Sequence, residues 1–127
     1  MEISAVGVSA TDLRRAVAFY ELLGFTFPPF DDGEVHVETV PGPGAQLMID
    51  GAELMTGLLG EPPRAGNTAA FAVRCASPAQ VDEVAARVAT AGHAVVTPPW
   101  DAPWQQRYAT VADPDGYRVD LYASSSS

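Results

Sequence analysis

The stretch Asp113-Pro114-Asp115-Gly116-Tyr117-Arg118-Val119-Asp120-Leu121 decides the fold of this 127-residue chain. Pro114 fixes φ, the aspartate side chains accept hydrogen bonds from nearby backbone N–H groups, and Gly116 relieves the crowding where the turn ends. The alternating residues that follow predict a strand with Val119 and Leu121 on one face and Asp120 on the other. A tight turn therefore leads directly into a strand that carries a carboxylate.

The N-terminal half begins with an apolar, β-prone stretch at residues 3–9, which predicts a strand. Thr11 or Asp12 can cap a helix that starts there, and Gly24 is the expected stop after a run of apolar residues at helical spacing. Proline and glycine then separate three short stretches with strand character, at residues 25–27, 34–40 and 46–49.

The C-terminal half repeats this plan. A strand is expected at residues 68–75, and Ser77-Pro78 with Gln80 is typical of a helix start, with serine as the N-cap and proline at the first helical position. Gly92 ends the helix. Three further strands complete the half, at residues 94–97, 107–112 and 117–122.

The turn at Asp113–Gly116, together with the segment from Thr11 to Phe25, resembles the vicinal oxygen chelate superfamily. That superfamily includes glyoxalase I, extradiol dioxygenases, fosfomycin-resistance enzymes and bleomycin-resistance proteins. The resemblance implies an α+β fold of two βαβββ modules, about residues 3–50 and 68–122, whose curled mixed sheets surround a cavity. We therefore expect a single domain over residues 1–127, with a linker at about residues 51–67.

In the metal-dependent relatives, four strand positions facing the cavity hold a divalent ion. The resemblance places these positions at Ala5, Met48, Thr68 and Asp120. Alanine cannot coordinate a metal, a thioether does not suit a hard-metal site, and a neutral hydroxyl is a poor ligand. Only Asp120 remains capable, so we expect no metal and no cofactor.

Two histidines are the other candidate ligands. His36 lies between Val35 and Val37, and it points towards the cavity if those valines are in the core. His93 directly follows Gly92, where a histidine often interacts with the last helix carbonyls. For each histidine, a partly exposed or hydrogen-bonded side chain is favoured over metal ligation.

Aromatic side chains would form the wall of such a cavity. Trp100 and Trp104 fall in one proline-rich loop that can present a rigid surface to a flat ligand, although they could instead cover the core or a dimer interface. Asp120 could pair with a ligand cation, or bond internally to Arg107, Arg118 or a tyrosine, because a buried carboxylate needs a partner. The predicted ligand-binding residues are Phe30, His36, Met48, Trp100, Trp104, Tyr108 and Asp120.

Composition excludes several classes of function. The formal charge of −9 argues against nucleic-acid binding, which needs clustered basic residues. No apolar run is long enough to cross a bilayer and no leader is recognisable, so we expect a cytoplasmic protein. Cys75 is alone and lies in an apolar strand pattern, which favours a buried, inert thiol.

Three functions remain open. The leading hypothesis is a protein similar to the bleomycin-resistance proteins, a homodimer that sequesters an aromatic or cationic natural product without changing it. The second is an enzyme of the same superfamily, either with other metal ligands or metal-free with acid–base work by Asp120, His36 or Tyr108. The third is a regulatory member that binds a metabolite weakly. Whether the modules pair within one chain or swap between subunits stays open.

Overall fold

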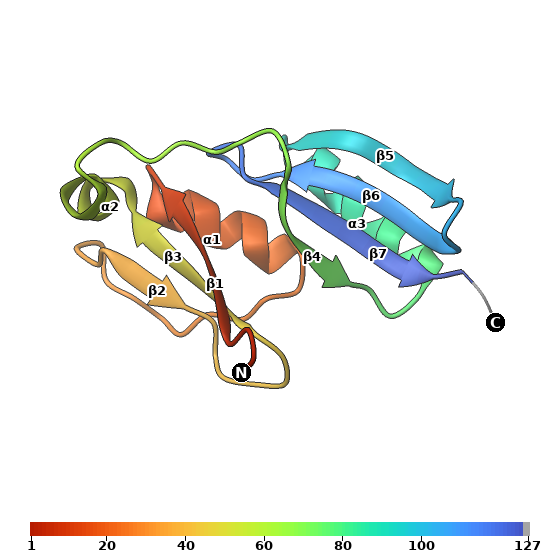
Figure 1. Ribbon diagram of the computed structural model, residues 1–127, viewed down its shortest axis with the longest axis horizontal. Helices are drawn as coiled ribbons and strands as arrows, with labels where there is room; N and C mark the ends of the chain where they lie inside the picture. Colours follow the sequence, from red (N-terminus) through yellow and green to blue (C-terminus); the bar gives the residue numbers. More distant parts are fainter. Residues whose placement is uncertain (126–127) are drawn as a thin grey trace. The chain divides into compact units, whose positions relative to one another are not determined.

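The computed structural model describes residues 1–125 of the chain (Figure 1). The chain divides into two compact units, Met1–Arg64 and Ala65–Ser127, each with its own sheet and at least one helix. The α+β class with one mixed sheet per module is as expected. Within residues 1–125, no helix is both long and apolar enough to span a membrane.

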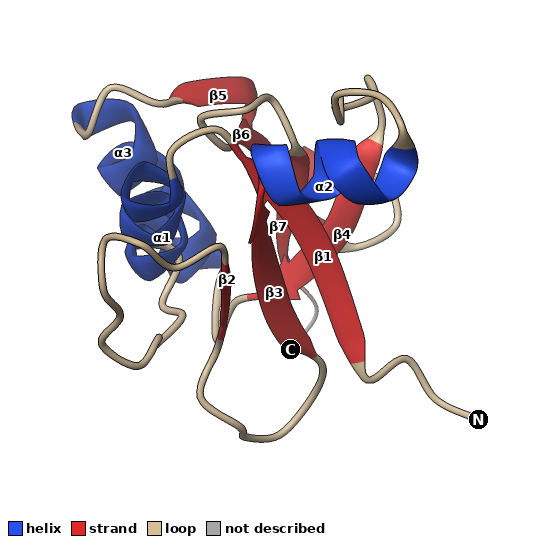
Figure 2. Cartoon of the chain, turned by 90° about the vertical axis from the view of Figure 1, so that its left-hand side faces the viewer, coloured by secondary structure: helices blue, strands red, loops and turns tan. Residues whose placement is uncertain are grey.

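Unit 1, Met1–Arg64, contains a mixed three-stranded sheet with α1 against one face (Figure 2). Its elements are β1 (Ala5–Ala10), α1 (Leu13–Leu22), β2 (His36–Glu38), β3 (Gln46–Gly51) and α2 (Ala52–Leu59). The central strand β3 pairs with β1 in parallel and with β2 in antiparallel orientation. Asp12 is the N-cap of α1, and its carboxylate accepts a hydrogen bond from the Arg15 N–H. Phe19 and Tyr20 of α1 are fully buried.

Two strand predictions for unit 1 were wrong in detail. Residues 25–27 form a loop instead of a strand, and the Val40 N–H donates a hydrogen bond to the Thr26 carbonyl. Pro28 and Pro29, which follow, have no N–H to continue a ladder. The strand expected at residues 34–40 is confined to His36–Glu38. The expected linker at residues 51–67 contains α2, whose N-cap Gly51 gives no side-chain signal.

Unit 2, Ala65–Ser127, has the complete βαβββ arrangement. Its elements are β4 (Ala69–Arg74), α3 (Pro78–Thr90), β5 (Ala94–Ala102), β6 (Gln106–Ala112) and β7 (Arg118–Ser124). The strand order is β4-β7-β6-β5, with β4 and β7 parallel and the other pairs antiparallel. The Ser77 side chain caps α3, as predicted. The buried side of α3 faces a core that includes Val111, Val119 and Leu121.

The turn at Asp113–Gly116 has the predicted chemistry. Asp113 is buried, and its Oδ1 accepts hydrogen bonds from the backbone N–H groups of Asp115 at 2.9 Å and Tyr117 at 3.0 Å. Gly116 has φ 90°, a value that favours glycine. The turn therefore fixes the start of β7 and the side of the sheet on which Asp120 lies.

Two further expectations for unit 2 have clear outcomes. Cys75 is buried, as predicted, and burial raises the pKa of its thiol. The strand expected at residues 94–97 continues to Ala102, so Trp100 lies on β5 and only Trp104 lies in the following turn. Register shifts on either side of Thr97 allow the strand to continue through the two prolines.

Candidate functional site

A pocket of about 300 Å³ lies on the face of the unit 2 sheet opposite the buried residues of β7. Its lining includes Trp100, Trp104, Tyr108 and Asp120, four of the predicted ligand-binding residues. Strand alternation produces this arrangement, because Val119 and Leu121 are fully buried while Asp120 between them points the other way. Trp100 lies on β5, Tyr108 on β6 and Asp120 on β7. Trp104 lies in the turn between β5 and β6.

The Asp120 carboxylate is hydrogen-bonded through both of its oxygens. The Tyr108 hydroxyl donates to Oδ2 and the Thr110 hydroxyl to Oδ1, each at 2.6 Å. The expected internal partner is therefore a tyrosine, whereas Arg107 pairs with Asp82 and Asp101 instead. The two hydroxyls fix the orientation of the carboxylate, and each oxygen keeps a second lone pair for another donor.

Tyr108 acts as a neutral donor in this arrangement. Burial, followed by the hydrogen bond to Asp120, raises the pKa of Tyr108 to about 12. A phenol with this pKa keeps its proton at neutral pH. Tyr108 is thus suited to hold the carboxylate in place and poorly suited to act as a general base.

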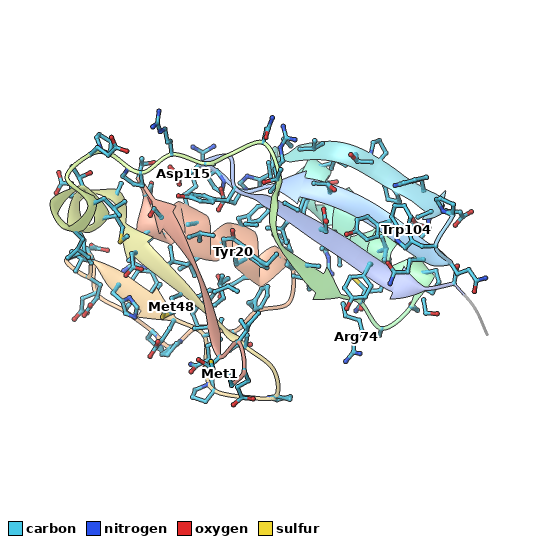
Figure 3. The ribbon with its side chains drawn as sticks, viewed as in Figure 1. Met1, Tyr20, Met48, Arg74, Trp104 and Asp115 are labelled. Atoms are coloured by element: carbon cyan, nitrogen blue, oxygen red, sulfur yellow. The ribbon has the colours of Figure 1, made fainter. Side chains whose placement is uncertain are left out.

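The aromatic residues form a continuous row beside Asp120. The ring centroids of Trp100 and Trp104 are 5.6 Å apart in an edge-to-face contact, and those of Trp104 and Tyr108 are also 5.6 Å apart. Tyr108 stacks on Tyr122 at 6.4 Å. Trp100 and Trp104 keep 40% and 54% of their surface exposed. Figure 3 shows Trp104 beside the strands of the unit 2 sheet.

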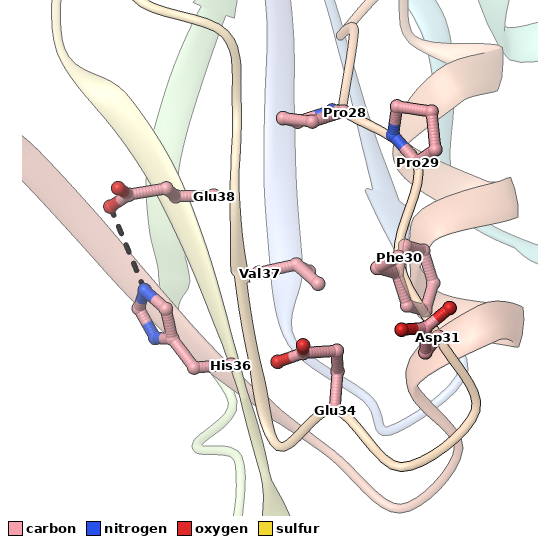
Figure 4. A pocket seen from close by; sticks show the side chains of 8 residues that line it. All are labelled: Pro28, Pro29, Phe30, Asp31, Glu34, His36, Val37 and Glu38. Carbon is pink, nitrogen blue, oxygen red and sulfur yellow. Dashed lines mark ion pairs between the residues drawn. The ribbon is translucent and has the colours of Figure 1, made fainter.

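Unit 1 holds the other three predicted residues. Phe30 and His36 line a pocket of about 420 Å³ within unit 1, between β2 and residues 28–31 (Figure 4). Met48 lies outside this pocket, on β3, where its partners across the sheet are Gly7 and Glu38. The seven predicted residues are therefore divided between the two units.

His36 is placed between two carboxylates that the sequence reasoning did not identify. Its Nδ1 lies 2.6 Å from Asp50 Oδ1, and its Nε2 lies 3.6 Å from Glu38 Oε2. The hydrogen bond to Asp50 is the main cause that raises the pKa of His36, and Glu38 adds to it. The antiparallel register aligns His36 with Asp50, so a correct pairing of the two predicted strands would have revealed the contact. Of the two valines expected in the core beside His36, Val37 is buried and Val35 is exposed.

The residues at the family's metal positions do not fit a divalent metal ion. Ala5, Met48 and Thr68 supply no carboxylate or imidazole, which leaves Asp120 as a single carboxylate among the four. Among residues 1–125, no group of three or more histidine, cysteine, aspartate or glutamate residues could hold an ion.

A repeated motif that the sequence reasoning missed lines both pockets. Pro28-Pro29-Phe30-Asp31 and Pro98-Pro99-Trp100-Asp101 each place two prolines, an aromatic residue and an aspartate after the module's helix. Phe30 and Trp100, the aromatic members, both line a pocket. An alignment of the two halves on Pro-Pro would have identified this relationship.

These features belong to a known class of proteins. The family model described as Glyoxalase/Bleomycin resistance protein/Dioxygenase superfamily matches residues 2–121, and the chain belongs to this superfamily. A glyoxalase/bleomycin resistance protein/dioxygenase from Nocardioides is 26% identical, with a TM-score of 0.70 over 98% of this chain and 83% of that one. TioX from Micromonospora sp. ML1 is 25% identical, with a TM-score of 0.68 over 98% and 99% of the two chains.

A third structure resembles the chain in fold alone. The glyoxalase-related enzyme from Fulvimarina pelagi is 20% identical, with a TM-score of 0.82 over 98% of this chain and 88% of that one. No curated protein sequence matches the chain at a significant level. The superfamily contains enzymes and resistance proteins, so the choice between these roles depends on the residues of the site.

Proposed function

We propose that the protein is a metal-free binding protein that sequesters an aromatic, cationic natural product, such as an antibiotic, without chemical change. The observation that carries the proposal is the pocket of unit 2, where exposed Trp100 and Trp104 lie beside the Asp120 carboxylate. The donor set at the family's metal positions supports the metal-free part of the proposal.

The ligand class follows from the chemistry of this pocket. Tryptophan faces attract flat aromatic rings and cations, and both effects strengthen when water is displaced. The free lone pairs of the Asp120 carboxylate can accept hydrogen bonds from a protonated amine. A ligand with an aromatic ring next to a basic nitrogen would satisfy both features at once.

A pocket of about 300 Å³ is at the small end of the range for drug-sized ligands. A larger antibiotic would extend beyond it, and we propose that a second subunit of a homodimer covers the remainder. Sequestration of a drug before it reaches its target would place the protein in the cytoplasm. Analytical ultracentrifugation with and without ligand tests the dimer.

The test is a tryptophan-fluorescence titration with bleomycin and a panel of DNA-damaging and polyaromatic antibiotics. We expect saturable quenching by at least one compound, with recovery of the ligand at unchanged mass. Asp120→Asn and Trp104→Ala should each weaken binding at least tenfold, the loss of about one strong polar or stacking contact. Glu83→Gln, an equal charge change at an exposed position of α3, is the matched control. Turnover of the ligand would refute sequestration.

The contact between His36 and Asp50 favours one alternative, a metal-free enzyme of the superfamily. A histidine oriented by a carboxylate can serve as a general acid or base. This alternative requires a substrate whose turnover is lost in His36→Ala. Unchanged turnover in that variant and in Asp120→Asn would eliminate both residues from the chemistry.

A further inference from the structure

We propose that the pocket of unit 1, between β2 and residues 28–31, is a slot for an extended, basic, peptide-like segment that adds a short strand to the edge of β2. This binding site is distinct in its residues from the pocket of unit 2, so it goes beyond the proposed function. The proposal rests on the edge of β2, the reason the slot stays open, and the charge of its lining.

The first observation is the direction of the backbone groups of β2. Val35 accepts a hydrogen bond from Gly51, and Thr39 donates one to Leu47, so the odd-numbered residues face β3. The N–H and C=O groups of His36 and Glu38 therefore point away from β3. Among residues 1–125, β2 is the outer strand of its sheet, so these groups face the slot. Two residues with outward groups can pair with a strand of about three residues.

The second observation is that the slot is closed at both ends and open between them. The Val40 N–H donates to the Thr26 carbonyl at one end, and the Glu34 N–H donates to the Asp31 carbonyl at the other. Continuing the antiparallel pairing from Thr26 would bring Pro28 opposite Glu38. Proline has no N–H to give to that pairing, so the segment separates from β2 at this point.

Arg14 of α1 holds the far wall of the slot. Its guanidinium donates to the Phe30 carbonyl at 2.9 Å and to Asp32 Oδ1 at 2.7 Å, and it lies 4.5 Å from the centroid of the Phe30 ring. The Phe30 carbonyl is thus occupied by Arg14. The wall is anchored to α1, and the slot does not depend on a mobile loop.

In unit 2 the corresponding Pro-Pro-aromatic-Asp segment stays paired with the neighbouring strand of its sheet. After Pro98-Pro99, pairing with β6 resumes, with Trp100 opposite Tyr108 and Asp101 opposite Arg107. The second half of β5 therefore pairs with the edge of β6, whereas the corresponding edge of β2 in unit 1 borders the slot. A short added strand in unit 1 would complete the sheet in the same manner.

The third observation is the charge and size of the lining. Asp31, Glu34 and Glu38 line a volume of about 420 Å³, in which Glu38 pairs with His36, and Pro28, Pro29 and Phe30 form the apolar wall (Figure 4). Unit 1 also contains most of the acidic residues of the chain. A basic segment is favoured by this charge, while its amide groups would bond to the backbone of β2.

The test uses ¹⁵N-labelled full-length protein and the peptide acetyl-arginyl-valyl-arginyl-valine amide. We expect saturable amide shifts at His36 and Glu38 with a Kd of about 1 mM or tighter. Methylation of the central amide nitrogens of the peptide should weaken binding at least tenfold, because it removes the strand-pairing donors. Glu34→Gln should weaken it about threefold, and Glu53→Gln on α2 is the charge-matched control.

Three results would overturn the proposal. They are equal binding of the corresponding glutamyl peptide, equal binding of the N-methylated peptide, or no shifts at His36 and Glu38 at saturating peptide. Each is independent of tryptophan fluorescence, so failure here is distinguishable from failure of the unit 2 pocket to bind an antibiotic.

Discussion

Asp120 and Tyr108 illustrate how single residues set the character of the unit 2 pocket. The phenol donates to the carboxylate over 2.6 Å, and the high pKa of Tyr108 keeps the proton on the phenol. Tyr108→Phe should lower the free energy of unfolding by about 1 kcal/mol, because a carboxylate loses one donor. Urea denaturation measures this change. Tyr122→Phe, on the neighbouring strand, is the control, and an equal loss there would contradict a specific role for the Tyr108 hydroxyl.

His36 gives a prediction about pH. Because Asp50 raises the pKa of His36, the protonated ring stabilises the folded protein. This contribution is complete below the unfolded pKa of about 6.5 and is lost as the pH rises through the higher folded value. The side chain is 41% exposed, so the effect on stability is small.

An NMR titration of the His36 ring measures this effect directly. In Asp50→Asn the pKa of His36 should fall towards its ordinary value. In the control variant Glu53→Gln the pKa of His36 should stay unchanged. An unchanged pKa in Asp50→Asn would show that the contact does not hold the proton.

At the scale of elements, the turn before β7 has the strongest sequence signal. Asp113 accepts two backbone hydrogen bonds while buried, so Asp113→Ala leaves two N–H groups without this acceptor. We expect a loss of about 2 kcal/mol in the free energy of unfolding, measured by thermal or urea denaturation. Glu83→Ala, at an exposed position of α3, should stay within about 0.5 kcal/mol of the parent protein. A similar small change in Asp113→Ala would contradict the structural role of the turn.

The other elements were predictable to different degrees, for physical reasons. The helices α1 and α3 begin at side-chain caps, Asp12 and Ser77, and both starts were identified. The helix α2 has glycine at its N-cap and offers no such signal. The two Pro-Pro segments have opposite outcomes, a continued strand at β5 and a loop after Phe27. The loop segment is contacted by Arg14, which lies far from it in the sequence, and local propensity does not report such contacts.

At the scale of the whole molecule, the predicted binding residues fall on both units of the chain. Trp100, Trp104, Tyr108 and Asp120 share one pocket because adjacent strands of unit 2 align them. Phe30 and His36 belong to a different pocket in unit 1. Strand parity predicts which face a residue occupies, but the register between strands decides which side chains meet. That register depends on the paired strands together, so it was accessible only from the structure.

We propose that this member of the superfamily binds its ligand without a metal ion. A calorimetric titration of metal-free protein with Zn²⁺, Ni²⁺, Mn²⁺ and Fe²⁺, in a weakly coordinating buffer, tests it most directly. The substitutions at Ala5, Met48 and Thr68 predict no one-site binding at about micromolar affinity or tighter. One-site binding of that strength, lost in Asp120→Asn, would contradict the account and make a metal-dependent enzyme the better description.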